Sequence, residues 1–336
     1  MMEPTKYQRI RLWAGITSIG TNLALIWGLA ISSAWWGSGL AGFMTTSVLL
    51  LAMAALVTIT NLPFDLLTGD AVERAAGRIE GTAWDWFKDW IRGRAVTFSG
   101  LWTGMLFFAA FQQLPRSWEP FLLLIAGIVI LILFLLVPAG HQSAACSTEE
   151  AFETSLKLEL KTLEIKLRPV RWFDQGDAET VNGYITPRGL LSLSRTVAQW
   201  LTPREAALMT LREEYYRRSG TWIMVLIIVA VWTLLGILLT RFLPAMNAVQ
   251  AGLNGAAMMT TWSFLALFVW PTLNRVWMRK ADAFLASFVT ADEVRDLLSK
   301  IEHLNATDIS LSPAKTVVFH PIPPLQDRLS NLDQLA

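Results

Sequence analysis

Residues 121–137 read FLLLIAGIVILILFLLV, an unbroken apolar run without a charged or polar side chain. As a helix, a run of this length crosses most of a bilayer core of about 30 Å. Five further stretches have similar length and character: 12–35, 40–62, 95–111, 222–239 and 253–270. The sequence therefore predicts a mainly α, polytopic membrane protein with about six transmembrane helices.

The composition supports this class. Hydrophobic residues make up 53% of the chain and charged residues 16%, whereas soluble domains carry about a quarter charged residues. A net charge of +1 gives no basis for nucleic-acid binding. The single cysteine, Cys146, excludes an intramolecular disulfide. The first apolar stretch is too long for the core of a signal peptide, so we interpret it as a retained first span.

The basic residues indicate the orientation. With six spans, Arg116 and Arg241 are the only Lys or Arg residues in the loops on one side, and the other 26 of 28 lie on the opposite side. The positive-inside rule makes that side cytoplasmic. Several tryptophans near the expected span ends fit an aromatic belt. We expect a multi-pass protein of an inner or plasma membrane, with both termini in the cytoplasm.

Four regions follow from these spans. Residues 1–138 hold the first four transmembrane helices, with a cytoplasmic loop at 70–94 that is rich in charge and tryptophan. A cytoplasmic segment at 139–220 follows, then the last two spans within 221–272. The C-terminal part, 273–336, is expected to form cytoplasmic helices that pack on 139–220, because each part is short for an independent domain.

The segment at 139–220 has mixed α and β character. A helix is expected over 148–167, with strands at 170–173 and 181–186. A second helix begins after Thr202, a good N-cap, because Pro203 and Glu205 follow at the first and third helical positions, and it extends to Arg218.

Here the sequence resembles the membrane zinc metallopeptidases of the CAAX prenyl protease type 1 and HtpX class. The resemblance covers nearly the whole chain and rests on motifs in the family's order. These are Tyr7-Gln8-Arg9, Leu62-Pro63-Phe64, Asn182-Gly183-Tyr184, Leu201-Thr202-Pro203-Arg204-Glu205, Met278-Arg279-Lys280-Ala281-Asp282 and Pro323-Pro324-Leu325-Gln326-Asp327-Arg328-Leu329. The resemblance implies a small cytoplasmic α+β peptidase-like domain and, in active relatives, an HExxH zinc site.

The residues that such a site needs are absent. HExxH places two histidines on one helical face to bind Zn²⁺ and a Glu to act as general base. The corresponding positions hold Arg212, a permanent cation, Glu213, and Tyr216, a poor zinc ligand. The family's third ligand position, four residues before Asp282, holds Met278, a thioether. Only the general-base carboxylate is retained, so we predict no catalytic residues, no cofactor and no bound zinc.

The three histidines give little support to another metal site. His141, His303 and His320 are not spaced as a helical pair, and we interpret them as unrelated surface residues. A hypothesis for Arg212 is that its guanidinium replaces the charge of the metal by bridging Glu213 and Asp282. The alternative is that Arg212 points into water.

The strand at 181–186 has two interpretations. In the resembled family, this edge binds a substrate peptide as an added strand, and Asn182 and Tyr184 match its motif, with Gly183 where the family usually has Ala. The strand can equally be a plain sheet edge.

We therefore predict a catalytically inactive pseudopeptidase that acts as a scaffold, subunit or binding partner in a membrane assembly. Its partners are the lipid bilayer and another membrane protein, not nucleic acid. The alternative is an active membrane metalloendopeptidase with a non-standard site that cleaves membrane-associated or lipid-modified proteins. A transporter or channel is disfavoured, because the expected spans lack ionisable residues in their cores.

Overall fold

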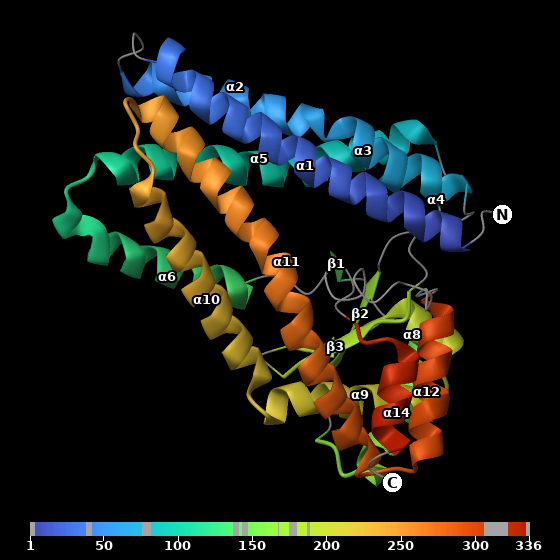
Figure 1. Cartoon of the computed structure of the whole chain (residues 1–336). Coiled ribbons are helices and arrows are strands. Elements are labelled where there is room, and N and C mark those ends of the chain that lie inside the picture. Colours follow the sequence, from blue (N-terminus) through green and yellow to red (C-terminus); the bar gives the residue numbers. More distant parts are fainter. Residues whose placement is uncertain are drawn as a thin grey trace. The chain divides into compact units, whose positions relative to one another are not determined.

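The computed structural model describes residues 4–37, 42–75, 82–136, 141–142, 147–166, 168–174, 180–186, 189–305 and 322–333. The chain divides into two compact units (Figure 1). The first comprises Met1–Ile132 and Ile228–Ala266, and the second comprises Leu133–Ile227 and Leu267–Ala336. Three helices, α6 (Glu119–Leu136), α10 (Thr221–Leu239) and α11 (Ala248–Ala286), continue from one unit into the other.

The first unit is built from long helices. Its α-helices, besides parts of α6, α10 and α11, are α1 (Pro4–Trp36), α2 (Phe43–Thr60), α3 (Leu62–Leu66), α4 (Val72–Ala75) and α5 (Ala83–Gln113). Ile26, Leu50, Met105 and Leu253 are buried together where α1, α2, α5 and α11 meet. Glycine allows the close approach of α11 to α5, because a Cβ at Gly252 would lie 2.7 Å from the carbonyl oxygen of Met105.

Among the described residues, five helical segments are long and apolar enough to cross a membrane: Arg9–Trp36, Phe43–Ala75, Ala83–Gln113, Thr221–Phe242 and Ala248–Ala286. They confirm the predicted class, a polytopic helical membrane protein. The expected fourth span is helical too, in α6, but it is not among these five. The number of spans and their orientation stay predictions.

The expected loop at 70–94 is mostly helical. A capping box starts α5 at Ala83, since the backbone N–H of Asp85 donates to Thr82 Oγ1 (3.2 Å) and that of Thr82 donates to Asp85 Oδ2 (3.3 Å). The charged residues at 83–94 are therefore the first turns of the helix that contains the third expected span. Trp90 and Arg94 of these turns both donate to Asp65.

The second unit contains a four-stranded sheet and the helices around it. Its strands are β1 (His141–Gln142), β2 (Val170–Asp174), β3 (Gly183–Ile185) and β4 (Leu191–Ser194), in the order β1-β2-β4-β3. β2 and β4 are parallel, and the other two pairs are antiparallel. Its helices, besides the ends of α6, α10 and α11, are α7 (Ser147–Thr162), α8 (Arg195–Trp200), α9 (Pro203–Arg218), α12 (Ala291–Leu304) and α14 (Leu325–Asp333).

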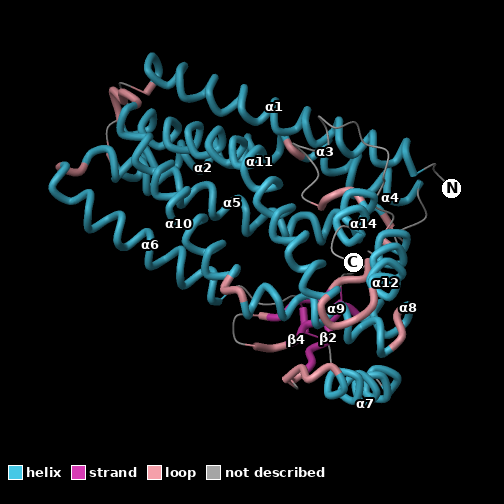
Figure 2. Tube along the Cα trace, turned by 60° about the horizontal axis from the view of Figure 1, so that its bottom comes forward, coloured by secondary structure: helices cyan, strands magenta, loops and turns pink. Residues whose placement is uncertain are grey.

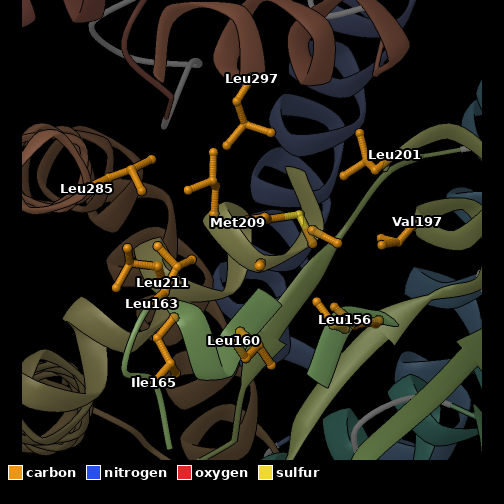
Figure 3. Close-up of a cluster of buried hydrophobic side chains, with 14 of the residues drawn as sticks. Leu156, Leu160, Leu163, Ile165, Val197, Leu201, Met209, Leu211, Leu285 and Leu297 are labelled. Atoms are coloured by element: carbon orange, nitrogen blue, oxygen red, sulfur yellow. The ribbon is translucent and has the colours of Figure 1, made fainter. Parts of the chain in front are cut away.

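Most elements predicted for this segment form. α7 ends earlier than the expected 148–167, and Glu164 just beyond it has a positive φ of 53°. β4 and α8 were not predicted. One core holds the unit together: Leu156 and Leu160 of α7 pack with Leu211 of α9, Leu285 of α11 and Leu297 of α12 (Figure 3). α9 contacts both α7 and β3, which sets its position against the sheet. Figure 2 shows α9 beside the labelled strands β2 and β4.

Candidate functional site

The start of α9 fixes the register of residues 212–216, the positions that the resemblance equates with HExxH. As predicted, Thr202 and Glu205 form a capping box: Thr202 N donates to Glu205 Oε2 (2.7 Å), and Glu205 N donates to Thr202 Oγ1 (3.2 Å). Lys300 of α12 also donates to Glu205 (2.8 Å). The helix continues without a break through Arg212, Glu213 and Tyr216.

Asp282 connects α9 with the C-terminal part of the chain. α11 is continuous through Pro271, so Met278 and Asp282 lie on the same helix as the sixth expected span. Arg212 Nε donates to Asp282 Oδ1 at 2.8 Å, and its Nη1 lies 3.9 Å from Glu213 Oε1. Arg328 of α14 donates from Nε to Oδ2 (2.7 Å) and from Nη2 to Oδ1 (2.9 Å). Arg212 is therefore hydrogen-bonded to Asp282 but only within ion-pair distance of Glu213, so the charge-replacement hypothesis is met in part.

The three side chains at the centre are largely removed from water. The exposed fraction is 13% for Arg212, 17% for Glu213 and 1% for Asp282. Burial raises the pKa of Glu213 to about 7, although the charge of Arg212 opposes the shift. Burial likewise raises the pKa of Tyr216 to about 12. At neutral pH the Tyr216 phenol is therefore neutral and cannot offer the phenolate that a metal would prefer.

The donors at this position do not fit zinc. A metal bound between positions 212, 216 and 278 would meet a guanidinium, a neutral phenol and a thioether. Among the described residues, no three His, Cys, Asp or Glu side chains are grouped so that they could hold a metal ion. His303 lies in the last turn of α12 and His141 in β1, whereas His320 and Cys146 lie outside the described residues.

A cavity of about 200 Å³ adjoins this cluster. Its wall contains residues of α9, α11, α12 and α14 and of the chain leading into β3, among them Asn182, Met209, Arg212, Glu213, Met278, Glu302 and Arg328. Met278, at the third lost ligand position, is 9% exposed and supplies part of the apolar wall. The cavity therefore lies where the motifs that carry the family resemblance meet, and Glu213 is one of the side chains that line it.

β3 is an edge strand of the described sheet and pairs on one side with β4. The strand is shorter than the expected 181–186, but the ladder extends to Asn182, whose carbonyl oxygen accepts from Ser194 N (2.9 Å). Because backbone groups alternate in direction along an antiparallel strand, the N–H and C=O of Gly183 and Ile185 face away from β4. These groups are the ones that an added strand can pair with.

At Val181, just before β3, the backbone groups that an added strand would use are already hydrogen-bonded. Val181 N donates to Asn305 Oδ1 (2.7 Å), and Asn305 Nδ2 donates to the Val181 carbonyl oxygen (3.1 Å). One side-chain amide from the end of α12 thus makes both hydrogen bonds that a neighbouring strand would make there. An added strand could therefore form hydrogen bonds only with the backbone of Gly183 and Ile185.

Packing explains the glycine in this motif. A Cβ at Gly183 would lie 2.7 Å from both Leu193 Cδ2 and Met209 Cε. The space that the methyl group of an alanine needs is therefore filled by core side chains of β4 and α9. Asn182 and Gly183 line the cavity, whereas Tyr184 packs with its ring centroid 5.7 Å from that of Phe173 on β2.

Two site residues escaped the sequence analysis. Arg328 was noted only as part of a motif, although an Arg near a closing Pro-Pro-Leu is the kind of cation that pairs with a buried Asp. Asn305 carried no signal, since an Asn at the end of a helix is ordinary. Their roles depend on contacts with Asp282 and Val181, which are distant in the sequence.

Comparison with known proteins identifies the fold. No family model and no curated protein matches the sequence. Among solved structures, the chain is similar to the crystal structure of Ste24p from S. mikatae, with a TM-score of 0.68 and 14% sequence identity. The match covers 94% of this chain and 81% of that chain. The chain has a Ste24p-like fold. This likeness at low identity concerns the backbone, so what the site does must be argued from its own residues.

Proposed function

We propose that this protein is a membrane pseudopeptidase: it keeps a Ste24p-like fold, lacks catalysis and serves as a scaffold or binding subunit in a membrane assembly. Ste24p is a CAAX prenyl protease of the zinc metallopeptidase class, and that activity needs a metal-activated water. The observation that carries the proposal is the 2.8 Å hydrogen bond from Arg212 to Asp282. It puts a fixed cation at the first ligand position.

Electrostatics favours this reading over a metal with unusual ligands. Arg212 and Arg328 already share the charge of Asp282. A divalent cation added beside two guanidiniums would be repelled by both in a poorly solvated site. Glu213 alone is too few ligands to offset this repulsion.

Restoring the ligands provides the test. The variant Arg212→His/Tyr216→His/Met278→Glu recreates the two helical histidines and the third carboxylate. Zinc would be measured by elemental mass spectrometry on protein purified in detergent. We expect far less than one zinc per wild-type chain and a clear gain in the triple variant. One zinc per wild-type chain would disprove the proposal.

One observation favours the alternative, an active endopeptidase with a non-standard site. Glu213 faces the cavity and has a pKa of about 7, which suits a general base. Peptide hydrolysis by the wild type that disappears in Glu213→Gln would establish this alternative. Hydrolysis that persists in Glu213→Gln would instead point to a contaminating protease.

The binding role is assigned to the outer edge of β3. Ile185→Pro removes an N–H that faces away from β4 and leaves the β3–β4 ladder intact. Ile185→Val keeps that N–H and is the matched control. Proteins that co-purify in mild detergent would be quantified for wild type and both variants. A partner bound through this edge is lost with the proline only; equal recovery from all three would remove β3 from the proposal.

A further inference from the structure

A second carboxylate on α9 collects more positive charge than it can neutralise. Glu214 is fully buried and lies one residue beyond the site residue Glu213. Three arginines converge on it: Arg168 Nη2 at 3.1 Å, Arg218 Nε at 3.1 Å, and Arg217 through Nε at 2.9 Å and through Nη2. Three guanidiniums around one carboxylate leave two positive charges uncompensated within this cluster.

The surplus charge is accessible from outside. Arg168 is enclosed, with 8% of its side chain exposed and a further hydrogen bond to the Gly189 carbonyl oxygen (2.9 Å). Arg217 and Arg218 are instead 38% and 44% exposed. Arg218 uses only Nε on Glu214, and no hydrogen bond or ion pair of its two Nη atoms occurs in the described part of the chain. Its guanidinium lies 6.0 Å from the ring of Phe284.

The arginines of this cluster lie close in the chain to the start of a candidate membrane span. α9 ends at Arg218, and α10, the helix of a candidate membrane span, begins at Thr221. Three residues cover at most about 10 Å of chain. Trp222 follows at once, as is usual for aromatic residues at the membrane interface. If α10 crosses the membrane, the two exposed guanidiniums would therefore lie at headgroup depth, beside the hydrocarbon core.

We propose that Arg217 and Arg218 bind the phosphodiester of an anionic phospholipid where α10 enters the membrane. Guanidinium groups recognise phosphate oxygens through paired N–H donors. Glu214 holds both side chains in place and so reduces the rotamer freedom that binding would otherwise remove. Inorganic phosphate offers the same chemistry, but the adjoining membrane span favours a lipid as its source. This inference is independent of whether the peptidase-like site is active.

The test compares three additives on protein purified in neutral detergent. We expect phosphatidylglycerol to raise the apparent Tm by about 2–4 °C, and phosphatidylcholine and inorganic phosphate to have little effect. Arg218→Gln should remove much of that rise, while Arg218→Lys, which keeps the charge but loses the paired N–H donors, should retain only part of it. The matched control is Arg295→Gln on α12, since Arg295 is 41% exposed and paired with Asp292 in solvent.

The possible results separate clearly. A rise with phosphatidylglycerol that is reduced in Arg218→Gln and unchanged in Arg295→Gln supports the site. An equal rise with phosphatidylcholine, an equal rise with inorganic phosphate, or a full rise in Arg218→Gln would overturn it. Should Arg218→Gln fold poorly, the same comparison is made by counting phosphatidylglycerol molecules retained by wild type and Arg218→Lys in native mass spectrometry. Absence of retained lipid in both would also overturn it.

Discussion

Asp282 and Glu214 are both buried carboxylates that bind arginines, and both involve α9, yet their surroundings differ. Asp282 is held by Arg212 and Arg328, whose side chains are only 13% and 6% exposed. Glu214 is held by Arg168 and by two arginines that reach solvent. In the first cluster every charge depends on the others, because water cannot replace a missing partner. In the second, water can solvate part of the charge. The first arrangement is suited to replacing a metal and the second to meeting an external anion.

The largest expected effect comes from removing the shared carboxylate of the enclosed cluster. Asp282→Asn leaves Arg212 and Arg328 buried without their counter-charge, which costs on the order of 3–5 kcal/mol. Glu214→Gln should cost less, since Arg217 and Arg218 can turn into solvent. Thermal unfolding of both variants in one detergent gives the comparison. An equal loss of Tm would show that the two clusters are energetically alike.

A pH effect of somewhat smaller size is expected at Glu213. Its pKa is raised from an ordinary 4.5 to about 7, so the folded state holds this proton more tightly than the unfolded chain. The resulting stability is fully present below pH 4.5 and is lost as pH rises through 7, by about 3 kcal/mol in all.

The measurement is the Tm at pH 5 and at pH 8 for wild type and Glu213→Gln. The wild type should lose more stability over this interval than the variant, which has no titrating group at that position. Parallel pH dependences would mean that Glu213 is ionised in the folded protein across the whole range.

Enlarging the glycine of the edge strand should have a moderate effect. Gly183→Ala places a methyl group 2.7 Å from Leu193 Cδ2 and Met209 Cε, and such overpacking costs about 1–3 kcal/mol. Met209→Ala frees space beside the new methyl group, so the double variant should lose less stability than the sum of the two single variants. Strict additivity of the two unfolding free energies would contradict direct packing between these positions.

The smallest loss of stability is expected for an exposed arginine of the Glu214 cluster. Arg217→Gln removes a side chain that is 38% exposed and leaves Arg168 and Arg218 on Glu214, so the loss should be about 1 kcal/mol or less. It should also shrink in high salt. If Arg217→Gln lost as much stability as Asp282→Asn in the same unfolding experiment, Arg217 would depend on its carboxylate as strongly as Arg212 and Arg328 do. The difference between the two clusters would then not hold.

Sequence reasoning succeeded where the signal is local. The capping box of Thr202 and Glu205 was predicted from residues three apart, and the structure has its hydrogen bonds. It was less accurate where a helix carries charge into a span: the third expected span begins at 95, but a capping box at Thr82 starts α5 at Ala83, so the charged residues at 83–94 belong to the same helix. β4 was missed, although its Leu-Ser-Leu-Ser alternation is a strand pattern.

The sequence by itself determined that the chain is a helical membrane protein, and it placed Arg212 and Tyr216 four residues apart on one helix, where the resemblance would put the HExxH histidines. Hydrophobic length and the register within one helix are properties of neighbouring residues, so no tertiary contact is needed to read them. Only the tertiary structure decided that Arg328 shares Asp282 with Arg212, that Asn305 closes the edge at Val181, and that Arg168 joins Arg217 and Arg218 on Glu214. These pairs are far apart along the chain, and their meeting depends on how the helices pack around one sheet.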